Sequence, residues 1–239
     1  MKKLMFASLA ALVFSGVFAE EKSAVDDHIN SILGLGIAAP LQFPKMSDNV
    51  YGLRLGLLMA YNNEIAGVDV SPVAIAEGDV MGIEAGLFNW AGSDVWGLQI
   101  GALANVVAGN SIACHIAAAN VVRGDAAGLE LSAVNYANSF KGLQVGALVN
   151  WNRAASLGAQ VAAVNVNSEY FTGFSLAAIN NSRNVVGFQL GAFNLAERMT
   201  GLQIGVFNAA YRMEGVQIGV LNMICENNTP VLPVANASF

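Results

Sequence analysis

Residues 187–222 read GFQLGAFNLAERMT, GLQIGVFNAAYRME, GVQIGVLN, which is one pattern written three times. The copies begin at Gly187, Gly201 and Gly215, so the period is 14 residues. Each copy runs glycine, apolar residue, glutamine, apolar residue, glycine, two apolar residues and asparagine, followed by six variable residues. A fixed short period predicts a repeat architecture, in which each unit packs mainly against its two neighbours.

The same pattern extends over most of the chain, in about twelve copies of mostly 14 or 15 residues. Their first residues are Gly52, Gly67, Gly82, Gly97, Ser111, Gly128, Gly142, Gly158, Gly173, Gly187, Gly201 and Gly215. The copy at Ser111 (SIACHIAAAN) is degenerate, and the pattern leaves its phase open. The tail PVANASF resembles a partial thirteenth copy with Asn236 at the asparagine position. We therefore expect one repeat domain over residues 52–239.

Within each copy, the residues after the first glycine alternate between apolar and polar, as in Leu202, Gln203 and Ile204. Alternation with a period of two predicts a strand with one buried face. The polar position is interpreted as facing water and the apolar pair as facing the core. The second glycine, such as Gly205, would let the backbone bend, and an apolar residue such as Met199, two before the next repeat, would fill the coil from its other side.

An asparagine ends the patterned half of nearly every copy. Asparagine tolerates the backbone of a corner and bonds to nearby main-chain groups. If each copy is one coil, these side chains stack about 4.8 Å apart and form an amide ladder. The predicted column is Asn89, Asn105, Asn135, Asn150, Asn165, Asn180, Asn194, Asn208 and Asn222.

Two all-β architectures fit this pattern. A parallel β-solenoid of about twelve coils needs only one kind of repeat, and it keeps the asparagines in one column. The alternative is an antiparallel outer-membrane β-barrel of about 14 strands, which the alternating segments and the terminal Phe239 favour. An antiparallel barrel would use a two-strand unit of about 28 residues and would place successive asparagines at opposite rims. These arguments favour the solenoid.

The N-terminal part does not match the repeat. Lys2 and Lys3, an apolar run over residues 4–18 and Ala19 predict a secretory signal peptide over residues 1–19. Residues 20–51 are expected to form a cap, because a solenoid needs its end shielded from water. Within this cap, residues 23–33 predict a short helix, and GLGIAAPLQF predicts an extended segment.

The charge balance limits the partners. Removal of Lys2 and Lys3 leaves nine basic against seventeen acidic residues. A chain this acidic repels nucleic acid and anionic lipid surfaces. Cys114 and Cys225 lie in apolar runs, which indicates buried, unpaired thiols.

No catalytic, cofactor-binding or metal-binding motif is recognisable in the sequence. Cys114 and His115 are adjacent, but neighbouring strand residues point to opposite faces, so they are not expected to form a catalytic pair. The cluster Asp26, Asp27 and His28 fits a solvated helix face better than a metal site. We therefore expect no enzyme activity and no cofactor.

Two surface features stay open as binding sites. Asp69, Glu84 and Glu130 share the polar column and would form a carboxylate row for Ca²⁺, although neutral glutamine fills most of that column. Aromatic residues in the variable halves fit either local packing or a recognition strip for a peptide or glycan. These aromatic residues are Trp90, Trp96, Tyr136, Trp151, Tyr170 and Tyr211.

The phrases GLQIGVFN, GVQIGVLN and GLQVGALVN, the ending LPVANASF and the opening PLQFP with YGLRLGLLMAYN resemble a family of bacterial surface repeat-containing proteins best known from leptospires. The resemblance covers residues 40–239. It implies export and a surface location, and it supplies no catalytic residue. The expected function is that of an exported, non-enzymatic surface protein with a structural or adhesive role; the alternative is a barrel that acts as a pore or anchor.

The expected location is the cell surface or the outer membrane, with the periplasm as the other possibility. The expected partners are a protein or glycan at the surface, the outer membrane itself, or a second copy of this chain.

Overall fold

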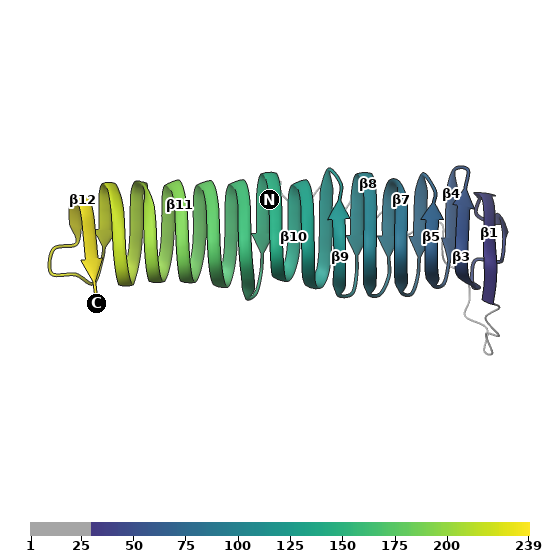
Figure 1. The fold of residues 1–239 in the computed structure, drawn as a ribbon, viewed down its shortest axis with the longest axis horizontal. Helices are drawn as coiled ribbons and strands as arrows, with labels where there is room; N and C mark the ends of the chain where they lie inside the picture. Colours follow the sequence, from purple (N-terminus) through teal and green to yellow (C-terminus); the bar gives the residue numbers. More distant parts are fainter. Residues whose placement is uncertain (1–29) are drawn as a thin grey trace, which may run out of the picture.

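Strands stacked side by side along one axis build a long rod, as Figure 1 shows for the computed structural model, which describes residues 30–239. The strands are β1 (Asn30–Ala38), β2 (Leu41–Phe43), β3 (Asn49–Gly56), β4 (Met59–Asn62), β5 (Ile65–Val70), β6 (Val73–Ala76), β7 (Val80–Ala91), β8 (Val95–Val107), β9 (Ser111–Ile116), β10 (Ala119–Asn152), β11 (Ser156–Ile224) and β12 (Val231–Ser238). β10 and β11 are continuous windings that each contain several coils.

Each coil lies parallel to the next. β3, β5, β7, β8, β9, β10 and β11 pair successively in parallel, and equivalent repeat positions face one another, as Gly82 faces Gly97. Among the described strands, antiparallel pairing occurs at the two ends, between β1 and β2 and between β11 and β12. This topology is that of a parallel β-solenoid, so the preferred fold is confirmed. The antiparallel barrel is wrong, because its neighbouring strands would have to run in opposite directions.

The polar column faces the inside of the coil, and the prediction that it faces water is wrong. Gln144 and Gln203 are fully buried, whereas the apolar neighbour Leu143 is 41% exposed. The alternation was therefore recognised correctly, but its two faces were exchanged. Glutamine can point inward because the stacked amides hydrogen-bond to one another: Gln203 Nε2 donates to Gln189 Oε1 at 2.7 Å and Gln217 Nε2 donates to Gln203 Oε1 at 2.8 Å.

The predicted asparagine ladder is present and continuous from Asn89 to Asn222. The Nδ2 atom of each member donates to Oδ1 of the next over 2.8–3.3 Å. Asn120 is a further member that the degenerate copy concealed from the sequence pattern. The asparagine donors point to the following coil, whereas the glutamine donors point to the preceding one.

Apolar side chains fill the other half of the interior. Val185, Met199 and Met213, two residues before the repeat glycines, are buried as expected. They form one cluster with Ala210 and Ile224, which come from the position two after the asparagine. Each coil thus encloses a polar half, built by the glutamine and asparagine columns, and an apolar half.

The degenerate copy is two residues out of its predicted phase. Ala113 pairs with Gly97 on one side and with Gly128 on the other, so this copy begins at Ala113 and not at Ser111. His115 consequently takes the buried polar position. The repeat pattern does not reveal this phase, because Ala113 replaces the glycine with which the other copies begin.

Both ends of the rod differ from the expectations. The signal peptide and residues 23–29 of the expected helix lie outside the described residues; residues 30–33 belong to β1, so the helix is wrong there. The segment GLGIAAPLQF forms the second half of β1 and then β2, with a turn between them. The tail is not a thirteenth coil, because β12 runs antiparallel to β11 and places Asn236 opposite Gln217.

Asn194→Ala should lower the free energy of unfolding by about 1–3 kcal/mol, because it removes a buried amide that donates to Ile204 O and Asn208 Oδ1 and accepts from Asn180. Asn236→Ala should cost less, because Asn236 lies outside the ladder, in the end strand β12, and its hydrogen bonds with Asn227 and Pro230 O hold only the terminal turn. Urea denaturation of both variants checks this. Equal shifts of the two midpoints would contradict a cooperative internal ladder.

Deleting residues 201–214 should leave a folded, shorter rod. The deletion places Gly215 on Gly187, and every remaining coil keeps a stacking partner of the same pattern, since the two glycines occupy the same column. Circular dichroism and small-angle scattering should show retained strand content and a rod about 5 Å shorter. A deletion of seven residues, 201–207, is the control, since it breaks the register and should abolish folding. Misfolding of the 14-residue deletion would contradict stability that is local to neighbouring coils.

Candidate functional site

The first group of chemically active side chains lies at the N-terminal end of the polar column. Arg54 Nη2 is 2.5 Å from Asp69 Oδ2 and 4.0 Å from Glu84 Oε1, and all three side chains are buried. Burial, and to a smaller extent the charge of Asp69, raise the pKa of Glu84, and Arg54 and Gln99 oppose this; the net result is a pKa of about 7. This cluster occupies the first three positions of the polar column, in the coils next to the cap.

A second buried group lies further along the same column. His115 Nε2 and Ser111 Oγ are 2.6 Å apart, and Glu130 occupies the next position in the column. Burial lowers the pKa of His115 to about 4 and raises the pKa of Glu130 to about 7. A hydroxyl beside an imidazole resembles part of a catalytic site, but both side chains are at most 2% exposed, so a substrate has no access to them.

The buried position of these groups changes two interpretations of the sequence. Asp69, Glu84 and Glu130 were expected on the surface as a candidate Ca²⁺ row, and they are inside the coils instead. Within residues 30–239, no three His, Cys, Asp or Glu side chains converge on a position where a metal ion could bind. Cys114 points outward from the strand and is half-buried while His115 points inward, so the two side chains do not meet, as expected.

Both cysteines are unpaired, as predicted, but only one of them is shielded from water. Cys225 is exposed, so the prediction that it is buried is wrong. It lies beyond the last buried position of β11, Ile224, where the chain leaves the coil.

An uncharged surface runs along the whole rod, between each repeat glycine and the following asparagine. We call it the apolar face. The two outward positions that flank the polar column carry an apolar residue in every copy, and the outward positions before the asparagine are also uncharged. Its exposed members are Leu53, Leu55, Leu57, Leu58, Val68, Val70, Ile83, Leu87, Ile100, Leu103, Ile116, Val134, Leu143, Leu148, Phe174, Ile179, Phe193, Val206, Ile218, Val220 and Leu221.

The apolar face continues onto the N-terminal cap. Leu35, Ile37 and Leu41 of the cap line an open hollow of about 860 Å³ together with Leu55 and Val70 of the first coils. The cap side chains are themselves exposed. The uncharged surface therefore extends from β1 to the last coil.

Large aromatic residues with a polar atom flank the apolar face on both sides. Trp90, Tyr136 and Trp151 directly follow members of the asparagine ladder, and Tyr136 and Trp151 contact each other edge to face at 5.7 Å. Tyr51 and Trp96 directly precede repeat glycines, on the opposite flank. The predicted aromatic strip is thus divided between separate columns.

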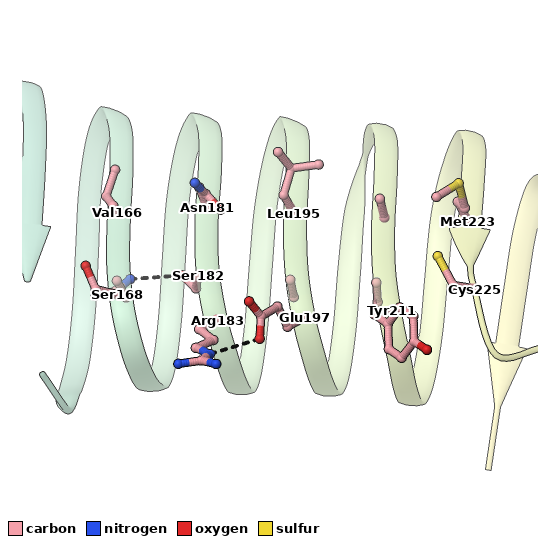
Figure 2. Close-up of a pocket in the computed structure, with 14 residues that line it drawn as sticks. Val166, Ser168, Asn181, Ser182, Arg183, Leu195, Glu197, Tyr211, Met223 and Cys225 are labelled. Atoms are coloured by element: carbon pink, nitrogen blue, oxygen red, sulfur yellow. Dashed lines mark hydrogen bonds and ion pairs between the residues drawn. The ribbon is translucent and has the colours of Figure 1, made fainter. Parts of the chain in front are cut away.

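The exposed charged side chains of the coils lie on the remaining side of the rod, between each asparagine and the next repeat glycine. Figure 2 shows part of this side, an open groove of about 590 Å³ that crosses the last coils of β11. Arg183 Nε donates to Glu197 Oε2 at 2.9 Å across neighbouring coils, in the groove. A second pair, in which Arg212 Nε donates to Glu226 Oε2 at 2.6 Å, does not line the groove. Exposed pairs of this kind add little stability. The two charged residues that line the groove, Arg183 and Glu197, are paired with each other.

Comparison with protein-family models, with curated proteins and with solved structures found no match. The described chain contains no helix of the length and hydrophobicity needed to span a membrane. The class is therefore defined by the geometry alone: a parallel β-solenoid with stacked amides inside and an apolar face outside. The surface-repeat family remains a resemblance that the motifs carry.

Proposed function

We infer that this protein is an exported, non-enzymatic repeat protein of the bacterial cell surface with a structural or adhesive role. The observation that carries this proposal is the apolar face, which runs along the whole rod. Soluble monomers rarely leave a contiguous apolar surface of this extent in water, and such surfaces usually serve as interaction sites. The rod therefore acts through its side and not through a pocket.

The placement of the reactive groups supports a non-enzymatic role. Three of the groups with shifted pKa values, Glu84, His115 and Glu130, lie inside the coils, where a substrate has no access to them. The charged residues that line the open groove, Arg183 and Glu197, are exposed and paired with each other, whereas enzymes use desolvated acids or bases.

Export and surface location rest on the signal peptide predicted over residues 1–19 and on the resemblance to surface repeat proteins. The acidic balance of the chain disfavours nucleic acid as the partner. A protein, a glycan or a membrane at the cell surface remains as the partner of the apolar face.

Expression of the full chain in a bacterium with two membranes tests this role. We expect processing of the N-terminus, recovery in the cell-envelope fraction and digestion by protease added to intact cells. The double variant Leu148→Glu and Val206→Glu, on the apolar face, should move to the soluble fraction. The control Tyr170→Glu and Tyr211→Glu adds the same charge at similarly exposed positions elsewhere and should stay in the envelope. Retention in the cytoplasm, or equal distribution of both variants, would contradict the proposal.

A further inference from the structure

We propose that the apolar face binds a lipid bilayer, with the rod lying flat in the membrane interface and its charged side in water. The inference rests on the surface role proposed above and names the partner of the apolar face. A membrane-bound orientation of this kind is known for amphipathic segments that bury one apolar side in the boundary between headgroups and acyl chains.

The backbone of the solenoid is suited to hydrocarbon. Each coil pairs in parallel with the coil before and the coil after it, so its main-chain donors and acceptors point along the rod axis. The side of the rod presents side chains and no open strand edge. Since unpaired backbone groups are what lipid does not tolerate, the side of a solenoid meets the requirement that closed structures meet in membranes.

The side chains follow the same division. In every copy, the two outward positions beside the polar column are apolar, such as Leu143 and Val145 or Ile204 and Leu202. The ion pairs of Arg183 and Arg212 lie on the other side of the rod. Burial of the apolar face therefore desolvates no charge, and the hydrophobic gain is not offset by the cost of burying an ion.

Tryptophan and tyrosine mark the borders of this face. All three tryptophans of the chain, Trp90, Trp96 and Trp151, stand directly before a repeat glycine or directly after a ladder asparagine. Tyr51 and Tyr136 take the same positions. These are the two residue types that concentrate at the level of lipid headgroups, where the ring is apolar on one side and its polar atom is hydrated. These tryptophans and tyrosines lie on both flanks of the apolar face and not at its centre, which fits a rod immersed up to the level of the lipid headgroups.

A second copy of the chain fits the face less well. A specific protein interface carries about one hydrogen bond per 100–200 Å² and a polar rim that fixes the register of the partners. The exposed members of the apolar face offer no side-chain donor or acceptor, and every coil repeats the same surface. Two such faces would slide along each other, whereas a fluid bilayer requires no register.

The acidic balance determines which lipid is preferred. Because acidic residues outnumber basic ones, a negatively charged surface repels the chain. We expect binding to zwitterionic phosphatidylcholine vesicles to exceed binding to vesicles with a third of phosphatidylglycerol. Binding to phosphatidylcholine should persist at about 1 M salt, where the Debye length falls to about 3 Å, because the attraction is hydrophobic.

Flotation of the exported protein with phosphatidylcholine vesicles tests the proposal. The unaltered chain and the control Tyr170→Glu and Tyr211→Glu should float, and Leu148→Glu with Val206→Glu should bind at least tenfold more weakly while its circular dichroism stays unchanged. In the unaltered chain, tryptophan emission should shift to the blue on binding, and bromine close to the headgroup should quench it more than bromine deep in the acyl chains. This second measurement does not depend on any variant.

Absence of flotation for the unaltered chain, or deep quenching, overturns the proposal. Sedimentation as a dimer that Leu148→Glu with Val206→Glu dissociates, without vesicle binding, assigns the face to a second copy instead. If vesicles do not bind but the same double variant still leaves the envelope fraction in cells, the surface role stands and only the lipid partner is wrong. If neither experiment distinguishes the variants, both proposals fail.

Discussion

Gly201→Ala should lower the free energy of unfolding by about 3 kcal/mol or more, through backbone strain and overpacking together. Gly201 has φ near 130°, a conformation that L-residues rarely adopt. A β-carbon at this position would collide with the carbonyl oxygen of Gly187 in the preceding coil. Because that oxygen belongs to the backbone, no side-chain rearrangement can relieve the contact.

The alanine of the same column provides the control. Ala113 takes the position of a repeat glycine. Its φ is not positive, since Val234 is the one non-glycine with positive φ among the described residues, so the backbone at Ala113 differs from that of the repeat glycines. Ala113→Gly should therefore cost no more than about 1 kcal/mol, the usual penalty of glycine against alanine. Guanidinium denaturation of both variants measures the difference. If Gly201→Ala loses no more stability than Ala113→Gly, the coils tolerate alanine in this column and the prediction is wrong.

Glu130→Gln should stabilise the protein by about 3 kcal/mol at pH 8 and change stability little at pH 4. The pKa of Glu130 rises from 4.5 to about 7 on folding, mainly through burial. A group with a raised pKa stabilises the fold fully while both states are protonated, and this contribution is lost as the pH rises from about 4.5 to about 7. Glutamine has the same shape, cannot ionise, and already occupies this column at Gln144, which donates to Glu130 Oε2 at 2.7 Å.

The comparison of variant and parent isolates this group. His115 has a pKa lowered from 6.5 to about 4, so its contribution increases with pH over that window and partly masks the effect of Glu130 in the parent chain. Glu197→Gln, at an exposed position, removes the same charge and should alter stability little at either pH. If the difference in unfolding free energy between Glu130→Gln and the parent does not grow from pH 4 to pH 8, folding does not raise the pKa of Glu130.

The sequence was sufficient to predict the fold, because its repeating unit is a single coil of 14 residues and not the two-strand unit that an antiparallel barrel requires. The 14-residue period of Gly187, Gly201 and Gly215 predicted equivalent coils, and it placed the asparagines in one ladder. The direction in which Gln203 points could not be read from the same pattern. Alternation defines two faces of a strand, but it does not say which face is inside when stacked amides satisfy each other.

The remaining errors have the same origin. If polar residues of a strand are equated with exposed ones, the pattern predicts Glu84 and Glu130 in a surface row and the outward leucines in the core. The apolar face, which is the basis of the functional proposals, was therefore missed. The sequence does contain a signal for this face. No charged residue occupies the outward positions between a repeat glycine and its asparagine, and the tryptophans Trp96 and Trp151 stand at the two edges of this uncharged segment.

The opposite directions of the two amide ladders affect the electrostatics of the last coils, where both ladders are present. Head-to-tail amides add their dipoles, as peptide units do in a helix, and a single ladder would accumulate partial charges of opposite sign at its two ends. Here the asparagine donors face one end and the glutamine donors, such as Gln203 and Gln217, face the other. In the coils of Gln189, Gln203 and Gln217, where both ladders run, each coil contributes two opposed dipoles, so a further coil of this pattern would add little field along the axis.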